Sequence, residues 1–102
     1  MFQYEIKQEK EKAIIYLNGS LSLRDTPKLR TEIKELIDSD SIKELVLDFQ
    51  HLSYLDSSGI GILLHTYSWT KEKNKKVKMV HLSNEIKTIF NVANLLEIFE
   101  VE

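Results

Sequence analysis

The chain has 102 residues, of which 42% are hydrophobic and 29% charged, with a formal net charge of −2 and no cysteine. This length and composition predict a single folded domain over residues 1–102. The slightly acidic balance argues against general binding of nucleic acid, and the lack of cysteine excludes disulfides, thiol catalysis and thiolate metal sites.

The amino-terminal part of the chain predicts a pair of strands. Apolar residues alternate with polar ones over residues 2–6, which is typical of a half-exposed strand. Residues 13–17 form a denser β-branched run, and we expect it to end at the turn signal Asn18-Gly19. The charged stretch 7–12 between the two runs is predicted to be a hairpin connection.

A helix and a buried strand are predicted next. Thr26-Pro27 offers a capping hydroxyl followed by a proline at the first helical position, where its missing N–H costs nothing. Residues 38–41 end this helix, and residues 45–49 are almost continuously apolar, as in a central strand that is covered on both faces. The core-facing stripe of the helix consists of Leu29, Ile33, Leu36 and Ile37.

The second half of the chain predicts helices alternating with strands. A helix is expected from residues 56–58 to about Lys73, followed by a strand over 77–82. Asn84 is predicted to cap a short helix, and residues 98–101 are predicted to form a last short strand. This order predicts an α/β fold with a small mixed β-sheet of four to five strands and about three helices.

The segment 52–64 carries the most informative chemistry. It connects a buried strand to a helix, so Ser57 and Ser58 are expected at a helix N-terminus on the carboxyl side of the sheet, where ligands approach α/β proteins. Free backbone N–H groups and the helix dipole can hold a phosphate there. The residue types also fit a purely structural interpretation, in which Asp56 or Ser57 is only the N-cap and the glycines allow close packing.

The sequence Asp-Ser-Ser-Gly-Ile-Gly at residues 56–61, after an apolar strand, resembles the signature of STAS-domain anti-sigma-factor antagonists. These are small bacterial proteins in which the serine directly after the aspartate is phosphorylated. The likeness covers nearly the whole chain. It implies a STAS-like fold with the phosphorylation site at Ser57 and with Asp56 and Ser58 as its neighbours.

This resemblance implies a regulatory protein that is not an enzyme and has no cofactor. The unphosphorylated form would bind an anti-sigma factor that is also a serine kinase and thereby release a sigma factor. Phosphorylation at Ser57 would end the interaction, and a PP2C-type phosphatase would restore it. We expect a cytoplasmic protein, a monomer or weak dimer, with no direct contact to nucleic acid or membrane.

Two alternatives stay open at this point. The chain could be a STAS subunit of a lipid-transport or signalling assembly, or a nucleotide-binding protein or enzyme that uses the helix end at Ser57. The family's Gly-Glu-apolar-Asp pattern reads Gly-Ser-Leu-Ser at residues 19–22, so Ser20 and Ser22 replace two carboxylates. This replacement is expected to bear on the positioning of the serine or the recognition of the kinase.

The helix after Ser57 suggests a docking surface. One stripe is predicted to face the core: Ile60, Leu63, Leu64 and Tyr67. Ile62 and Trp69 fall on the opposite side, and exposed there they would suit a partner interface, where tryptophan is enriched. Alternatively, this helix is buried on more than one side, or Trp69 fills a gap under a loop. The predicted partner-binding residues are Asp56, Ser57, Ser58, Gly59, Ile62 and Trp69.

Other chemistry is not indicated by the sequence. His51, His65 and His81 lack the spacing of metal ligands, so no metal site is predicted. The Gly-x-Ser-x-Gly pattern of serine hydrolases is absent. Gly59 and Gly61 lack both the third glycine of a dinucleotide fingerprint and the lysine of a P-loop.

Overall fold

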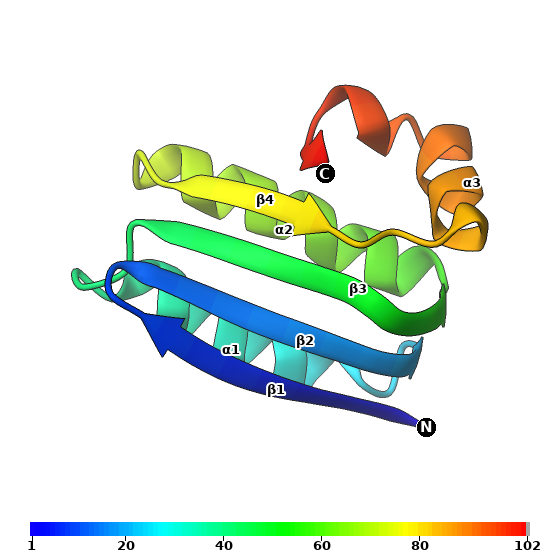
Figure 1. Ribbon diagram of the computed structural model, residues 1–102, viewed down its shortest axis with the longest axis horizontal. Coiled ribbons are helices and arrows are strands. Elements are labelled where there is room, and N and C mark those ends of the chain that lie inside the picture. The colour runs from blue at the N-terminus through cyan, green and yellow to red at the C-terminus, as the bar shows by residue number, and fades with distance from the viewer. Residues whose placement is uncertain (102) are drawn as a thin grey trace.

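A computed structural model describes residues 1–101, which form a five-stranded sheet with three α-helices and one short 3-10 helix (Figure 1). The strands lie in the order β1-β2-β3-β4-β5; β1 is antiparallel to β2, and all other neighbours are parallel. The predicted α/β fold with a mixed sheet is therefore confirmed. The elements are β1 (Phe2–Glu9), β2 (Lys12–Leu21), α1 (Thr26–Asp38), β3 (Glu44–Leu55), α2 (Ser57–Glu72), β4 (Lys76–Val80), α3 (Asn84–Val92), η1 (Leu95–Glu97) and β5 (Glu100–Val101).

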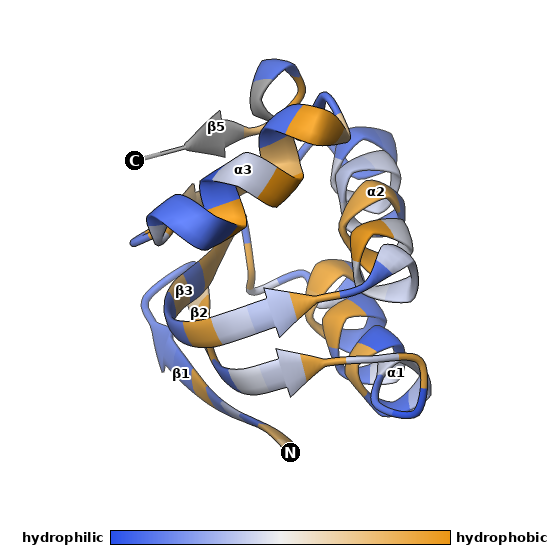
Figure 2. Cartoon of the chain, turned by 90° about the vertical axis from the view of Figure 1, so that its right-hand side faces the viewer, coloured by the Kyte–Doolittle hydropathy of each residue, from blue (hydrophilic) through white to orange (hydrophobic). Residues whose placement is uncertain are grey.

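The helices are distributed unevenly around the sheet. α1 and α2 lie next to each other on one face (Figures 1 and 2). Both begin at the end of the sheet where β2 and β3 finish, and α3 packs near the same end of β3 (Figure 1). The helices connect parallel strands, and this arrangement brings several loops together at the carboxyl ends of the strands.

The core lies between the sheet and the two adjacent helices. Alternate residues of β2 are buried, whereas residues 45–49 of β3 are buried on both faces, as the sequence predicts. Burial of each large aliphatic side chain stabilises the fold by roughly 1.5–3 kcal/mol. Of the four predicted stripe residues of α1, three are about 1% exposed, namely Leu29, Ile33 and Ile37. The fourth, Leu36, is half-buried.

The prediction that the second strand ends at Asn18-Gly19 is wrong. β2 continues to Leu21, with register shifts against β3 on both sides of Asn18 and Gly19. Gly19 has a φ of 92°, and a Cβ atom at this position would lie 1.9 Å from the backbone oxygen of Met1. A glycine here therefore permits a kink inside a paired strand, because the amino-terminal end of the chain passes too close for a side chain.

Four predicted element ends also differ from the structure. Thr26 is not a cap, because its hydroxyl donates to the carbonyl of Leu23 at 3.0 Å and Asp25 occupies the N-cap position. Ser83, rather than Asn84, caps α3, its hydroxyl accepting the N–H of Ile86 at 3.2 Å. β4 ends at Val80 because the next residue adopts a positive φ, and the last strand comprises only residues 100–101.

Candidate functional site

The turn from β3 to α2 is organised by Asp56. This residue is the N-cap of α2, and its Oδ1 accepts the backbone N–H groups of Ser58 at 3.0 Å and Gly59 at 3.1 Å. The hydroxyl of Ser58 donates to the same carboxylate oxygen. The Asp56 N–H in turn donates to the carbonyl of Leu21 at 3.2 Å, which ties the turn to the end of β2. The N-terminus of α2 is therefore held in a fixed position.

The two adjacent serines have different environments. The Ser58 hydroxyl is engaged with Asp56, whereas Ser57, the first residue of α2, is exposed. Within residues 1–101, the Ser57 side chain makes no hydrogen bond. Its hydroxyl is thus available for reaction at a helix N-terminus, where the helix dipole favours an added negative charge.

The environment of Asp56 favours its charged form. The hydrogen bond from the Ser58 hydroxyl, together with the N–H of Gly59, lowers the pKa of the Asp56 carboxyl below its ordinary value. The carboxylate therefore places a negative charge next to Ser57 at neutral pH. Any partner that docks on Ser57 would meet this charge as well.

The lowered pKa of Asp56 predicts a specific acid sensitivity. The carboxylate stabilises the fold above its unfolded-state pKa, near 3.8, and this contribution is lost as the pH falls through the lower pKa of the folded state. Asp56→Asn keeps a capping side chain that does not titrate. The free energy of unfolding of the wild type, measured by urea denaturation relative to Asp56→Asn, is expected to be constant above about pH 5 and to decrease as the pH falls from there to about 3. A difference that is constant with pH would contradict this prediction.

The side chains of Ser20 and Ser22 form hydrogen bonds at the end of β2. The N–H and the hydroxyl of Ser22 both donate to Asp25 Oδ2, at 3.1 and 3.0 Å. Ser20 lies 3.5 Å from the hydroxyl of Ser53, which donates to the carbonyl of Gly19 at 3.0 Å. Asp25 thus provides a carboxylate beside Ser22. Asp25 was not among the predicted site residues, although the Ser-x-x-Asp spacing is typical of such local side-chain-to-backbone turns.

The predicted faces of α2 need correction. Ile62, expected to be exposed, is 4% exposed, whereas Leu64, expected in the core, is 41% exposed. Apolar residues occur all around this helix, so their spacing does not define one buried face. Thr66 and Thr70 can be buried because their hydroxyls donate to backbone carbonyls of the same helix, at 2.8 and 2.9 Å.

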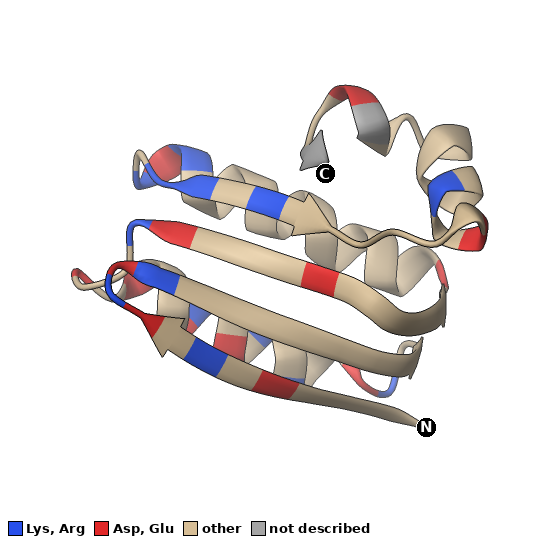
Figure 3. Ribbon diagram, viewed as in Figure 1, with Lys and Arg blue, Asp and Glu red and all other residues tan. Residues whose placement is uncertain are grey.

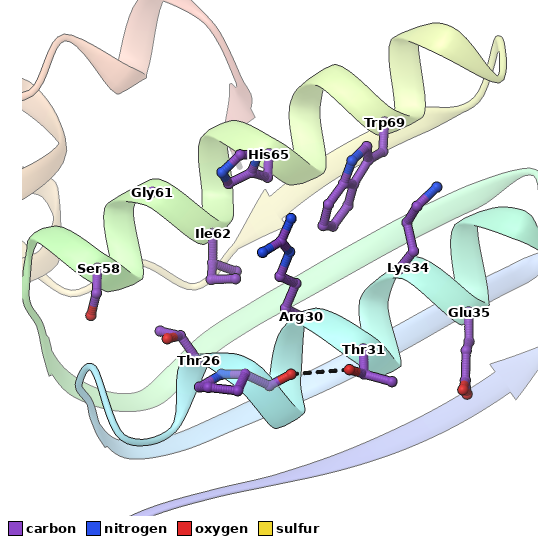
Figure 4. Close-up of a pocket in the computed structure, with 11 residues that line it drawn as sticks. Thr26, Arg30, Thr31, Lys34, Glu35, Ser58, Gly61, Ile62, His65 and Trp69 are labelled. Atoms are coloured by element: carbon purple, nitrogen blue, oxygen red, sulfur yellow. Dashed lines mark hydrogen bonds between the residues drawn. The ribbon is translucent and has the colours of Figure 1, made fainter.

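Of the two other predicted partner-binding residues, Gly59 is packed in the interior and Trp69 lies at the border of a groove. Gly59 is buried, and a Cβ atom there would lie 3.0 Å from the Cβ of Leu55. Trp69 is half-buried, packs against the core and borders a groove between α1 and α2 (Figure 4). Among the predicted partner-binding residues, only Ser57 is therefore exposed; Asp56, Ser58 and Trp69 are half-buried, and Ile62 is buried but lines the groove.

The groove contains two basic side chains that the sequence analysis did not single out. The guanidinium of Arg30 lies 5.7 Å from the centroid of the Trp69 ring, and the ammonium of Lys34 lies 5.5 Å from it. His65 stacks on the same ring, with centroids 5.6 Å apart. The i, i+4 spacing of Arg30 and Lys34 shows that they share one side of α1, but only the packing of two helices brings them to Trp69.

The described part of the chain contains neither a candidate membrane-spanning helix nor a candidate metal site. Residues 1–101 contain no helix with the length and apolar character needed to span a membrane. The same residues contain no group of three or more histidine, aspartate or glutamate side chains arranged to hold a metal ion.

Comparison with known proteins agrees with this architecture. The chain is 23% identical over 97 residues to the anti-sigma-B factor antagonist of Bacillus subtilis (strain 168), covering 95% of this chain and 87% of the relative. It superimposes on the anti-sigma factor antagonist SpoIIAA in its unphosphorylated form with a TM-score of 0.78 at 22% identity, covering 100% of this chain and 87% of that one. For phosphorylated Bacillus SpoIIAA the TM-score is 0.79 at 20% identity, covering 98% and 91%. Since the STAS domain family model matches residues 3–102, this chain belongs to the STAS domain family.

Proposed function

We propose that this protein is an anti-sigma factor antagonist that is controlled by phosphorylation at Ser57. In its unphosphorylated form it binds an anti-sigma factor that is also a serine kinase, and this binding releases a sigma factor. The kinase transfers a phosphoryl group to the Ser57 hydroxyl, which ends the interaction. A PP2C-type phosphatase removes the group and restores binding.

The exposed hydroxyl of Ser57 at the N-terminus of α2 is the observation that carries this proposal. It is accessible to a kinase, whereas the neighbouring Ser58 hydroxyl is bonded to Asp56. The function named for the relatives in the comparison, which share the fold over most of their length, supports the same role.

The position of Ser57 suits a switch that acts on the interface rather than on the fold. A phosphate adds about −1.5 to −2 charge units and three acceptor oxygens. The N-terminus of α2 favours this charge, so α2 need not rearrange. Lys and Arg gather mainly at the opposite end of the sheet (Figure 3). The added charge, next to the Asp56 carboxylate, would therefore face a docked partner.

The proposal is tested by capture and phosphorylation. Wild type, Ser57→Ala and Ser57→Asp are immobilised, exposed to lysate of the source cells, and the retained proteins are identified by mass spectrometry. We expect an ATP-binding serine kinase to be held by wild type and Ser57→Ala and to be released from Ser57→Asp. With ATP, this kinase should phosphorylate wild type but not Ser57→Ala.

Ser58→Ala is the matched control, because it removes the adjacent hydroxyl and leaves Ser57 in place. Ser58→Ala should still accept phosphate. If phosphorylation is lost in Ser58→Ala but kept in Ser57→Ala, the acceptor is Ser58 and the proposal is contradicted. A transport or scaffold protein that is bound equally by all three immobilised forms would instead support a STAS subunit of a larger assembly.

A further inference from the structure

The groove between α1 and α2 has a distinctive combination of side chains (Figure 4). It extends from Ser58, next to the proposed phosphorylation site, along α2 to Trp69. Gly61 leaves its wall open, since no atom lies within 4 Å of a Cβ built at this position. Its other wall is formed by α1, from which Arg30 and Lys34 project toward Trp69 (Figure 4).

Arg30 and Lys34 differ in how their charges are paired. Its guanidinium lies against the Trp69 ring, and within residues 1–101 no carboxylate pairs with it. Lys34, by contrast, is paired with Asp38 at 3.3 Å. The contact with the indole restricts the Arg30 side chain, so part of the entropy cost of binding an anion is already met in the free protein.

We propose that this groove binds an acidic peptide segment of the anti-sigma factor, with a carboxylate of that segment on Arg30. A planar guanidinium offers parallel N–H donors that match the two oxygens of a carboxylate. This inference rests on the proposed function and adds the chemistry by which the partner is recognised.

The charges around the groove favour a peptide over a polyanion. The chain carries a formal net charge of −2, which repels a uniformly negative nucleic acid or membrane surface. Glu35 also lines the groove, and Asp38 lies one turn beyond Lys34 on α1. Figure 4 shows the Glu35 side chain pointing away from Arg30, so a single carboxylate can reach Arg30, whereas a continuous run of phosphates would also lie against the acidic groups.

The same placement connects recognition to phosphorylation. Ser58 lines one end of the groove, and Ser57 directly precedes it. An acidic segment in the groove therefore passes close to Ser57. A phosphate there would repel the segment electrostatically, in addition to any contact that it blocks.

Trp69 provides a direct readout because it is the only tryptophan of the chain. The protein is labelled with fluorotryptophan, and its single fluorine resonance is followed by NMR while the purified kinase identified above is added. We expect this resonance to shift on binding. Arg30→Gln should weaken the affinity about tenfold or more, as expected for loss of a charge-assisted pair.

Lys28→Gln is the matched control, since it removes one positive charge from α1 at a residue that does not line the groove. It should change the affinity less than about twofold. Arg30→Lys should restore part of the affinity by returning the charge without the planar donors. Thermal unfolding of each variant shows that it is folded.

Failure of the inference differs from failure of the proposed function. If the kinase does not bind wild type, both are contradicted. If it binds but the fluorine resonance stays unchanged, or Arg30→Gln behaves like Lys28→Gln, the groove is not the docking site and the proposed function stands. Hydrogen exchange on the kinase should protect a segment containing Asp or Glu; a protected segment without them overturns the inference. An equal shift of the fluorine resonance on addition of single-stranded DNA or phosphatidylglycerol vesicles would also overturn the inference.

Discussion

Phe90→Ala is expected to lower the free energy of unfolding by about 3–5 kcal/mol, which is a large part of the stability of a domain of this size. Phe90 is fully buried and meets Phe49 of β3 in an edge-to-face arrangement with ring centroids 5.5 Å apart. Truncation removes this contact and leaves a cavity between α3 and the sheet. Urea denaturation followed by circular dichroism measures the loss.

Val92→Ala is the control in the same helix, because Val92 is 81% exposed. Its effect should lie within about 0.5 kcal/mol of zero. Similar small losses for both variants would show that α3 does not pack on β3 as the Phe49–Phe90 contact requires. If Phe90→Ala loses stability but still retains the same partner in the capture experiment, α3 contributes to stability rather than to docking.

Two glycines of α2 should respond oppositely to the same substitution. At Gly59, the alanine Cβ would lie 3.0 Å from the Cβ of Leu55 and 3.3 Å from two atoms of Leu21. Leu55 Cβ is attached to the backbone of β3, so relief requires movement of the helix start or the strand. We expect Gly59→Ala to destabilise the fold by about 1–2 kcal/mol, since the overpacking exceeds the gain in helix propensity.

At Gly61 the alanine Cβ meets no atom within 4 Å. Gly61→Ala therefore gains helix propensity without a clash and should stabilise the fold by about 0.5–1 kcal/mol. Urea denaturation of both variants under one set of conditions gives the comparison. Stabilisation by both substitutions would mean that the turn before α2 yields easily, and the fixed placement of Ser57 would then be doubtful.

The candidate site was largely predictable because its residues are consecutive. The apolar strand before it and the helical spacing after it place residues 56–58 at a strand-to-helix turn, and the structure has α2 beginning at Ser57. Local sequence could not separate the two serines, because the hydrogen bond of Ser58 to Asp56 depends on the conformation of the turn. The phosphorylation of Ser57 and the partner-binding role of its neighbours stay predictions.

The predictions from sequence that proved wrong concern places where local signals compete with contacts between distant residues. Asn18-Gly19 is a turn signal in isolation, but pairing with both β1 and β3 keeps these residues in β2. In α2, polar and apolar residues are too evenly spread for periodicity to select Ile62 over Leu64 for burial. The neighbouring sheet and α1 made that selection, since residues in contact with both lose the most apolar surface to water.

The sequence by itself determined the order of strands and helices, the core stripe of α1 and the position of the Asp-Ser-Ser-Gly turn, because these follow from the spacing of apolar residues and from local capping. Only the tertiary structure decided the rotation of α2 and the meeting of Arg30 with Trp69. Those two residues are far apart in the chain and are brought together by the packing of α1 beside α2 on a shared sheet, which no local pattern encodes.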